Sequence, residues 1–175
     1  MTRKPMISET STIIRRLREA DRREVLAHLR ALPQDDQRLR FGHAAGDVIT
    51  NYVSDIDFHR DHLYAAHDAQ GRIVGLAHVP MRRKVAELGL SIMPAARGQG
   101  LGHALSRHAL QAAARGGARA FRFHFASSNE AMRRIATSLG MRVSRDGSDL
   151  VAQRPLAAAR LSAALPHSAD LQAAA

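Results

Sequence analysis

The stretch that decides the fold is Glu-Leu-Gly-Leu-Ser-Ile-Met-Pro-Ala-Ala-Arg-Gly-Gln-Gly-Leu-Gly-His, residues 87–103. An apolar strand pattern runs into Pro94, a loop with glycines at positions 98, 100 and 102 follows, and a helical pattern begins behind it. Glycines let backbone N–H groups converge on one point, and the dipole of the following helix adds positive potential there. The stretch therefore predicts an anion-binding loop with Arg97 beside it; a tight strand-to-helix turn is the alternative.

Two better-known phosphate loops do not fit this order of residues. A Walker loop has Gly-Lys followed by Ser or Thr, whereas Leu101 follows Gly100 here. A dinucleotide fingerprint spaces its glycines by two and then three, usually in the first βα unit of a chain. Here the spacing is two and two, past the middle of the 175 residues. The loop therefore belongs to another kind of anion site.

The loop resembles the acyl-CoA signature of the GNAT acyltransferase superfamily, which has Gln or Arg, two residues, Gly, one residue, and Gly or Ala. Arg97, Gly100 and Gly102 fill those positions, and Ile92-Met93-Pro94 matches the strand end before them. The resemblance covers about residues 10–156 and continues with Asn129, Met132 and Leu139-Gly140-Met141.

Within the superfamily the chain is most similar to the acetyltransferase domain of Pat-type protein lysine acetyltransferases. The shared features are Leu39-Arg40-Phe41, Asp55, Asp57, Gly71-Arg72-Ile73-Val74-Gly75, Ala86-Glu87, and Asn129 with Met132. The resemblance implies an α/β GNAT fold, with a mixed, mostly antiparallel sheet that is flanked by helices and splayed between the strands ending at Met93 and Phe125. It also implies an N-acetyltransferase that moves an acetyl group from acetyl-CoA to an amine, either a protein lysine or a small molecule.

The composition limits the number of domains and the cellular location that we expect. A chain of 175 residues, 45% of them hydrophobic, can bury one ordinary core. No apolar run approaches the roughly 20 residues that span a bilayer, and no apolar stretch follows Arg3 and Lys4 as a secretory signal would require. We expect a cytoplasmic protein without a membrane partner, with a frayed N-terminus over 1–9, the acyltransferase domain over 10–156 and an Ala-rich tail over 157–175.

The net charge of +10 raises the question of a nucleic-acid partner. Arg supplies all but two of the 26 basic residues, which are spread along the chain with no block longer than Arg82-Arg83-Lys84. Trp is absent and aromatic residues make up 4%, so platforms for base stacking are few. We expect solvated surface charge and no nucleic-acid partner, although the same field would attract a polyanionic cosubstrate.

Periodicity and turn residues outline the elements. Strands are expected over 10–16, 62–67, 72–79, 85–93, 118–125, 141–143 and 149–153, and helices over 21–32, 47–53, 101–115 and 127–139. Asp21 is the expected N-cap of the first helix, and Ser127 with Glu130 reads as a capping box for the last. The turn Asp68-Ala-Gln-Gly71 predicts a hairpin.

The resemblance assigns the cosubstrate site largely to backbone groups. The backbone of 90–92 would pair with the pantetheine arm and donate an N–H to the thioester oxygen, while the glycine loop would hold the pyrophosphate. Asn129 would hydrogen-bond the pantetheine, with helix capping as the alternative. The expected cofactor-binding residues are Leu90, Ser91, Ile92, Arg97, Gly98, Gln99, Gly100, Leu101, Gly102, His103 and Asn129.

Acyl transfer to an amine also needs a base, because the acceptor arrives mostly protonated. Glu87 is the candidate catalytic residue, since it shares a strand face with Gly89, whose missing side chain would leave room for a ligand. Pat-type domains place their proposed base at this position. The alternative is an ion pair with the basic residues of 82–84, and His124, on the polar face of its strand, is the next candidate.

The usual acid of the family is missing. Many GNAT enzymes have a Tyr seven residues after the Asn, where this chain has Ala136, although Pat-type domains lack that Tyr too. A catalytically weak acyl-CoA-binding regulatory module is therefore the second hypothesis. Cys is absent and no Gly-x-Ser-x-Gly elbow occurs, which favours direct attack of the amine over a covalent intermediate.

Less can be read about metals, the acceptor and assembly. His59 and His62 lack a nearby carboxylate pair or Cys, so no metal is expected. The acceptor pocket would be built by the region 43–62 and the final hairpin. Asp47, Asp55 and Asp57 would suit a cationic amine, with a solvated or capping role as the equal alternative. A homodimer is left open.

Overall fold

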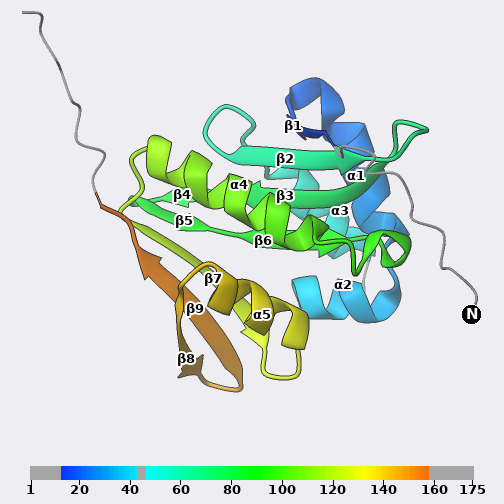
Figure 1. Ribbon diagram of the computed structural model, residues 1–175. Helices are drawn as coiled ribbons and strands as arrows, with labels where there is room; N and C mark the ends of the chain where they lie inside the picture. Colours follow the sequence, from blue (N-terminus) through cyan, green and yellow to red (C-terminus); the bar gives the residue numbers. More distant parts are fainter. Residues whose placement is uncertain (1–12, 43–45, 158–175) are drawn as a thin grey trace, which may run out of the picture.

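The computed structural model describes residues 13–42 and 46–157 (Figure 1). The expected frayed N-terminus over 1–9 lies outside these residues, as do positions 10–12 of the first strand and all of the expected tail except residue 157. The helices are α1 (Arg22–Ala31), α2 (Gln34–Phe41), α3 (Gly46–Ser54), α4 (Leu101–Arg115) and α5 (Glu130–Ser138). The strands are β1 (Ile14–Arg16), β2 (His62–His67), β3 (Ile73–Val79), β4 (Met81–Arg82), β5 (Val85–Glu87), β6 (Gly89–Ile92), β7 (Ala120–Ala126), β8 (Arg142–Asp146) and β9 (Asp149–Pro155).

The strands form two sheets that part between β6 and β7. One sheet has the order β1-β2-β3-β6 and the other β4-β5-β7-β9-β8. All neighbouring strands pair antiparallel except β5 and β7, which run parallel. The predicted mixed, mostly antiparallel and splayed sheet is therefore confirmed, with the split at the expected place.

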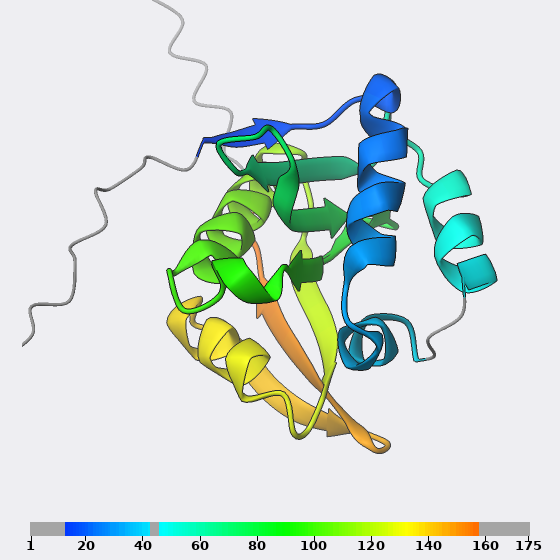
Figure 2. The same ribbon diagram turned by 90° about the vertical axis from the view of Figure 1, so that its right-hand side faces the viewer.

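Helices cover both faces of the sheets. Figure 2 shows α4 and α5 on one face and α1, α2 and α3 on the other. One core lies under α4 and α5, and a second lies between the first sheet and α1 with α3. Helix α2 contacts both β6 and β7, so it closes the far side of the split.

Two elements follow their sequence pattern closely. In α4, Leu101, Leu105 and Ala109 recur at helical spacing and are all buried, as the stripe predicted. In β7, Phe121, Phe123 and Phe125 are 0%, 0% and 4% exposed, whereas the residues between them face the other way. The hairpin joining β2 to β3 is also confirmed, and a turn at Gly147, with a φ of +60°, joins β8 to β9.

The run 85–93, which we expected as one strand, is two strands in different sheets. β5 pairs with β4 and β7, whereas β6 pairs with β3. The chain crosses from one sheet to the other at Leu88, whose N–H still bonds to the carbonyl of Arg122 at 2.8 Å. The crossing opens the split, and it leaves the second edge of β6 without a strand partner among the described residues.

The helix starts differ from expectation in detail. Asp21 stands at the N-cap of α1 but makes no side-chain capping bond there; its carboxylate accepts from the backbone of Arg18 and from Arg15 instead. The expected capping box from Ser127 is wrong, because α5 begins at Glu130 and is capped by Asn129. Helix α2 has no counterpart among the expected elements, since none of its residues is buried and its pattern carries no apolar stripe.

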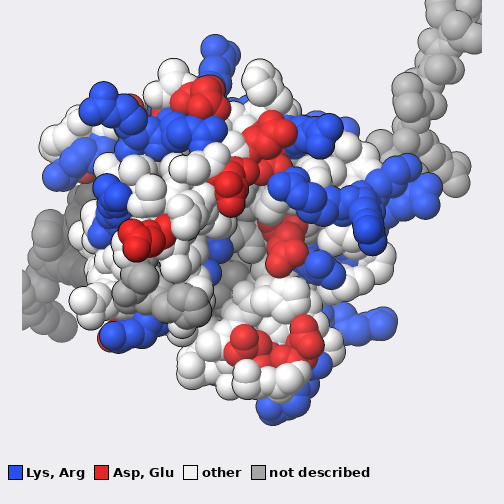
Figure 3. Space-filling model, turned by 180° about the vertical axis from the view of Figure 1, so that it is seen from behind, with Lys and Arg blue, Asp and Glu red and all other residues white. Residues whose placement is uncertain are grey.

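The surface carries both signs of charge. On the face in Figure 3, Lys and Arg side chains are interspersed with Asp and Glu. In the part of the chain that the structure describes, no helix combines the length and the apolar character that crossing a membrane requires.

Candidate functional site

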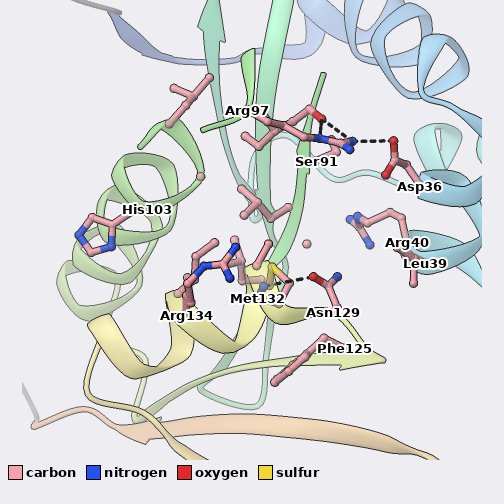
Figure 4. A pocket seen from close by; sticks show the side chains of 18 of the residues that line it. Asp36, Leu39, Arg40, Ser91, Arg97, His103, Phe125, Asn129, Met132 and Arg134 are labelled. Carbon is pink, nitrogen blue, oxygen red and sulfur yellow. Dashed lines mark hydrogen bonds and ion pairs between the residues drawn. The ribbon is translucent and has the colours of Figure 1, made fainter. Parts of the chain in front are cut away.

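The split between β6 and β7 opens into a pocket of about 650 Å³ (Figure 4). Its walls come from α2, β6, β7, α4 and α5, together with the glycine loop before α4. Both faces of the sheet contribute: Leu90 and Ile92 point toward α4, whereas Gly89 and Ser91 face α2 and α1. The pocket therefore connects the α4 and α5 side of the molecule with the α2 side.

The glycine loop has the backbone that the anion-binding prediction requires. Gly98 and Gly100 have φ values of +74° and +77°, which favour glycine, and a Cβ added to either would meet nothing within 4 Å. Gly102 differs, because its Cβ would lie 3.3 Å from Ile135 Cδ1, so the residue lets α4 and α5 approach. Leu101 begins α4, and the N–H groups of its first turn have no partner within the helix.

The structure brings nearly all of the predicted cofactor-binding residues into this one pocket. Gln99 is the exception: it does not line the pocket, and its Nε2 donates to the carbonyl of Ala95 at 3.3 Å. The predicted residues that do line it are Leu90, Ser91, Ile92, Arg97, Gly98, Gly100, Leu101, Gly102, His103 and Asn129.

Arg97 is tied to the pocket wall. Its Nη2 lies 2.6 Å from Asp36 Oδ2, and Nε and Nη2 donate to the carbonyl of Ile92 at 3.1 and 3.0 Å (Figure 4). Asp36 on α2 thereby offsets the charge of Arg97. The loop backbone, rather than this side chain, is left as the main source of positive potential for an anion.

Asn129 fulfils the capping alternative. Its Oδ1 accepts from the backbone N–H of Met132 at 3.2 Å, so it caps α5. It also lines the pocket, and its amide nitrogen remains free to donate to a ligand. Capping and ligand binding are thus compatible here. Ala136, where many members of the resembling superfamily have Tyr, is 0% exposed and lies in the core.

Glu87 lies next to the pocket but not on its wall. Its Oε1 is 3.3 Å from Nδ1 of His124, and its Oε2 is 3.3 Å from Nη2 of Arg122. The expected alternative partners over 82–84 are therefore wrong, because the parallel pairing of β5 and β7 sets Glu87 opposite Arg122. His124 does line the pocket, and its Nε2 lies 3.3 Å from Asp146.

The space expected beside Gly89 is filled. A Cβ built on Gly89 would lie 1.8 Å from Nη2 and 2.4 Å from Cζ of Arg40, so this guanidinium occupies the volume that the glycine leaves. Asp47, Asp55 and Asp57 do not line the pocket; Asp57 instead accepts from the backbone of His59 and Arg60 in a turn. The α2 side of the pocket is accordingly basic rather than acidic.

A chain of hydrogen bonds runs from Arg40 into the core. Arg40 Nη2 donates to the hydroxyl of Tyr52 at 2.6 Å, and that hydroxyl contacts Nδ1 of His78. Nε2 of His78 lies 3.1 Å from Oδ2 of Asp61, and Arg82 donates to Oδ1 of the same carboxylate at 3.0 Å. Because Arg40 can only donate, the Tyr52 hydrogen goes to His78, which then gives its own N–H to Asp61.

The ionisation states agree with this order. Burial lowers the pKa of His78 and outweighs the opposing effect of the Asp61 carboxylate. The lowered pKa favours a neutral imidazole. For Asp61, burial raises the pKa, but the hydrogen bonds from His78 and Arg82 outweigh it and lower the pKa overall. The chain thus consists of a charged guanidinium, two neutral groups and a charged carboxylate.

A second buried histidine supports β6. His28 of α1 is 4% exposed, with Nδ1 2.9 Å from the carbonyl of Ile73 and Nε2 2.8 Å from Ser91 Oγ. Neither buried histidine was predicted from the sequence. Their signal was present: His28 stands three positions after Val25 on the apolar face of α1, and His78 interrupts an almost wholly buried strand. A polar residue in such a stripe indicates a buried partner.

These histidines predict a fall in stability with acid. Burial lowers the pKa of His28 and His78 from 6.5, so the unfolded chain binds more protons than the folded one below that value. Above pH 6.5, the titration of these two histidines should not change the free energy of unfolding. Below it, the free energy should fall by at most about 1.4 kcal/mol per pH unit for each histidine.

Urea denaturation at pH 7.5, 6 and 5 measures this. His28→Gln should reduce the pH dependence, because the buried group no longer titrates. His59→Gln, which changes an exposed histidine, is the matched control and should leave it as in the unaltered chain. Equal pH dependence in all three proteins would contradict the prediction.

No group of three or more His, Cys, Asp or Glu side chains is arranged to hold a metal ion in the two described segments.

Comparison with known proteins bears on this geometry. A family model described as "Acetyltransferase (GNAT) domain" matches residues 12–142. No curated protein matches the chain in sequence. Several solved structures do share its fold.

The GNAT domain of S. lividans PAT is 16% identical with a TM-score of 0.70, covering 82% of this chain and 89% of that one. A phosphinothricin acetyltransferase (Pat) from Sinorhizobium meliloti, in complex with AcCoA, is 18% identical with a TM-score of 0.68, covering 84% and 89%. A GCN5-related N-acetyltransferase from Kribbella flavida is 24% identical with a TM-score of 0.65, covering 85% and 100%.

Proposed function

Since the chain belongs to the GNAT family of acetyltransferases, we propose that it moves an acetyl group from acetyl-CoA to an amine by direct attack. The observation that carries this proposal is the pocket through the split between β6 and β7. The glycine loop lies on one side of it and Arg40 and His124 on the other. A cosubstrate and an acceptor can therefore approach from opposite sides and meet beside β6.

The cosubstrate half of the site rests on backbone groups. The N–H groups of the loop and of the first turn of α4 would bind the pyrophosphate. The edge of β6 at Leu90, Ser91 and Ile92 lacks a strand partner among the described residues, although Arg97 already bonds to the carbonyl of Ile92. This edge would pair with the pantetheine amides in the manner of an added strand, and one N–H would polarise the thioester carbonyl. Asn129 would donate a hydrogen bond from its side-chain amide, and the side chain of His103, in the first turn of α4, would line the same half of the pocket.

The chemistry needs a proton acceptor near the amine. We assign this role to Glu87, acting directly or through water, with His124 as its neighbour on the pocket wall. The ammonium gives a proton to Glu87, the nitrogen forms a C–N bond to the acetyl carbon, and the C–S bond breaks. The nitrogen then gives up a second proton, which passes through water to the CoA thiolate. Within the described residues, no Ser in a nucleophile elbow competes with this direct attack.

The acceptor is an amine of a protein lysine or of a small molecule. Two structures of the same fold carry names that bear on these classes, one a PAT domain and one a phosphinothricin acetyltransferase. Their low identity leaves the choice to experiment.

A direct test measures release of CoA thiol from acetyl-CoA with amines, amino acids and lysine-containing peptides, beside calorimetric binding of acetyl-CoA. Transfer to any amine class supports the proposal. Tight binding of acetyl-CoA with no transfer across the panel would contradict it and would favour the alternative, a regulatory acyl-CoA-binding module. Absence of acetyl-CoA binding would contradict both functions.

A further inference from the structure

Among the guanidinium groups that line the pocket, Arg40 contacts the Gly89 end of β6, whereas Arg97 contacts the other end at Ile92. Arg40 extends from α2 into the pocket (Figure 4) and lies over Gly89, whose Cβ position is 1.8 Å from Nη2. Gly89 directly precedes Leu90, the first of the residues that would hold the thioester end of the cosubstrate. A ligand group bound to Arg40 would therefore lie beside Gly89, next to the residue that would hold the thioester end of the cosubstrate.

No carboxylate in the described segments pairs directly with the guanidinium of Arg40. Among the described residues that line the pocket, Asp36 is the single carboxylate, and it is paired with Arg97 at 2.6 Å. The nearest acid along the hydrogen-bond chain of Arg40 is Asp61, beyond Tyr52 and His78. Asp61 is in turn shared with Arg82 at 3.0 Å. The guanidinium thus faces the pocket as a cation that lacks an anion.

The same chain of contacts holds the guanidinium in place. Its Nη2 is fixed by the Tyr52 hydroxyl, and its Cζ lies 5.1 Å from the ring centroids of both Phe41 and Tyr52. A cation fixed in this way loses little conformational freedom when a ligand binds. Its remaining N–H groups form the planar fork that matches a carboxylate with two parallel hydrogen bonds.

We propose that Arg40 binds a carboxylate on the acceptor, so that the amine acetylated by this protein belongs to a small molecule of the amino-acid class. The proposal rests on the acetyltransferase function above and narrows its acceptor. In an α-amino acid the amine and the carboxylate are attached to the same carbon. A carboxylate on Arg40 therefore sets the amine near the thioester that β6 would hold. Tyr52, His78 and Asp61 act behind Arg40 as positioning residues.

The test compares amino acids with the matching amines that lack the carboxylate, for example histidine with histamine and tryptophan with tryptamine. The unaltered chain should acetylate at least one amino acid with a kcat/KM at least about tenfold above that of its matching amine. Arg40→Gln should remove this preference by lowering kcat/KM for the amino acid about tenfold, while changing it less than threefold for the amine.

Two further variants make the test specific. Arg38→Gln removes an exposed guanidinium from the same helix, paired with Asp35 at 2.9 Å, and should leave both acceptors unaffected. Tyr52→Phe removes the hydroxyl that holds Arg40, and should raise KM for the amino acid severalfold with kcat nearly unchanged. A purely structural role of Tyr52 would affect both acceptors equally.

A binding measurement separates this inference from the proposed function. Calorimetry of the CoA-loaded chain with amino acids requires no turnover, and binding that Arg40→Gln weakens about tenfold supports the inference. Equal acetylation of amino acids and matching amines, or equal losses for both in Arg40→Gln, would overturn it and leave the acetyltransferase function intact. If neither transfer to nor binding of any carboxylate-bearing amine is detected, the inference is also overturned.

Discussion

Glu87→Gln is expected to lower kcat for acetyl transfer by about 100-fold or more, with acetyl-CoA affinity changed only a few-fold. The amide keeps the size of the side chain and one of its two acceptor oxygens, but it cannot accept the ammonium proton. Glu87 adjoins His124 on the pocket wall, with 3.3 Å between Oε1 and Nδ1, and its side chain is 44% exposed, so water can reach it. The low-pH limb of the kcat profile should flatten in the variant.

Stability distinguishes a base from an ion-pair partner. Arg122 and Glu87 are 40% and 44% exposed, so their pair should contribute no more than about 1 kcal/mol to the free energy of unfolding. Glu24→Gln, at an exposed carboxylate on α1, is the matched control and should retain full turnover. Nearly full turnover in Glu87→Gln with a clear loss of stability would make Glu87 a structural partner and His124 the next candidate.

Elements whose pattern is local could be predicted from the sequence. The bounds of α4 follow from its apolar stripe and from the glycines at 116 and 117, where the latter has a φ of +79°. The alternation of Phe121, Phe123 and Phe125 likewise needs only neighbours two positions apart. The glycine loop was predictable for the same reason, because its backbone conformation depends on its own glycines. From these local patterns the fold and the pocket wall nearest to the loop could be predicted.

Contacts between distant segments could not be predicted in this way. Whether 85–93 forms one strand or two depends on which strands pair beside it, and β3 and β7 compete for the two halves. The partners of Glu87 lie 35 and 37 positions further along the chain. Helix α2 forms without a buried residue of its own, and therefore gives no amphipathic signal.

The acceptor side of the pocket shows the consequence for function. Arg40 was visible in Leu39-Arg40-Phe41, and Gly89 was visible as a small residue, but only the packing of α2 on β6 brings the two together. The acidic residues at 47, 55 and 57, for which an acceptor lining and a solvated or capping role were both left open, do not line the pocket. Because a basic side chain, Arg40, lines the α2 side of the pocket, an acceptor with an anionic group fits there. The tests above therefore compare amines with and without a carboxylate.

Gly100→Val should weaken acetyl-CoA binding at least about 30-fold, because the side chain would stand where the loop N–H groups converge and would remove two or more charge-assisted hydrogen bonds. The Cβ position of Gly100 has nothing within 4 Å, so no protein atom needs to move to admit it. The φ of +77° adds backbone strain of about 1–2 kcal/mol, which lowers stability without by itself blocking the ligand. Titration calorimetry gives the affinity directly.

The control variant Gly71→Val distinguishes the effect of backbone strain from the effect of blocking the anion site. Gly71 has the same φ of +77° and equally open space at its Cβ position, but it lies in the hairpin between β2 and β3, away from the pocket. Both valine variants should therefore lose similar stability, measured as melting temperature, whereas only Gly100→Val should lose acetyl-CoA. If both variants bind acetyl-CoA as the unaltered chain does, the loop is a strand-to-helix turn and the anion site lies elsewhere. If both lose affinity equally, strain rather than occlusion explains the loss, because the two positions share their backbone conformation and differ in what faces them.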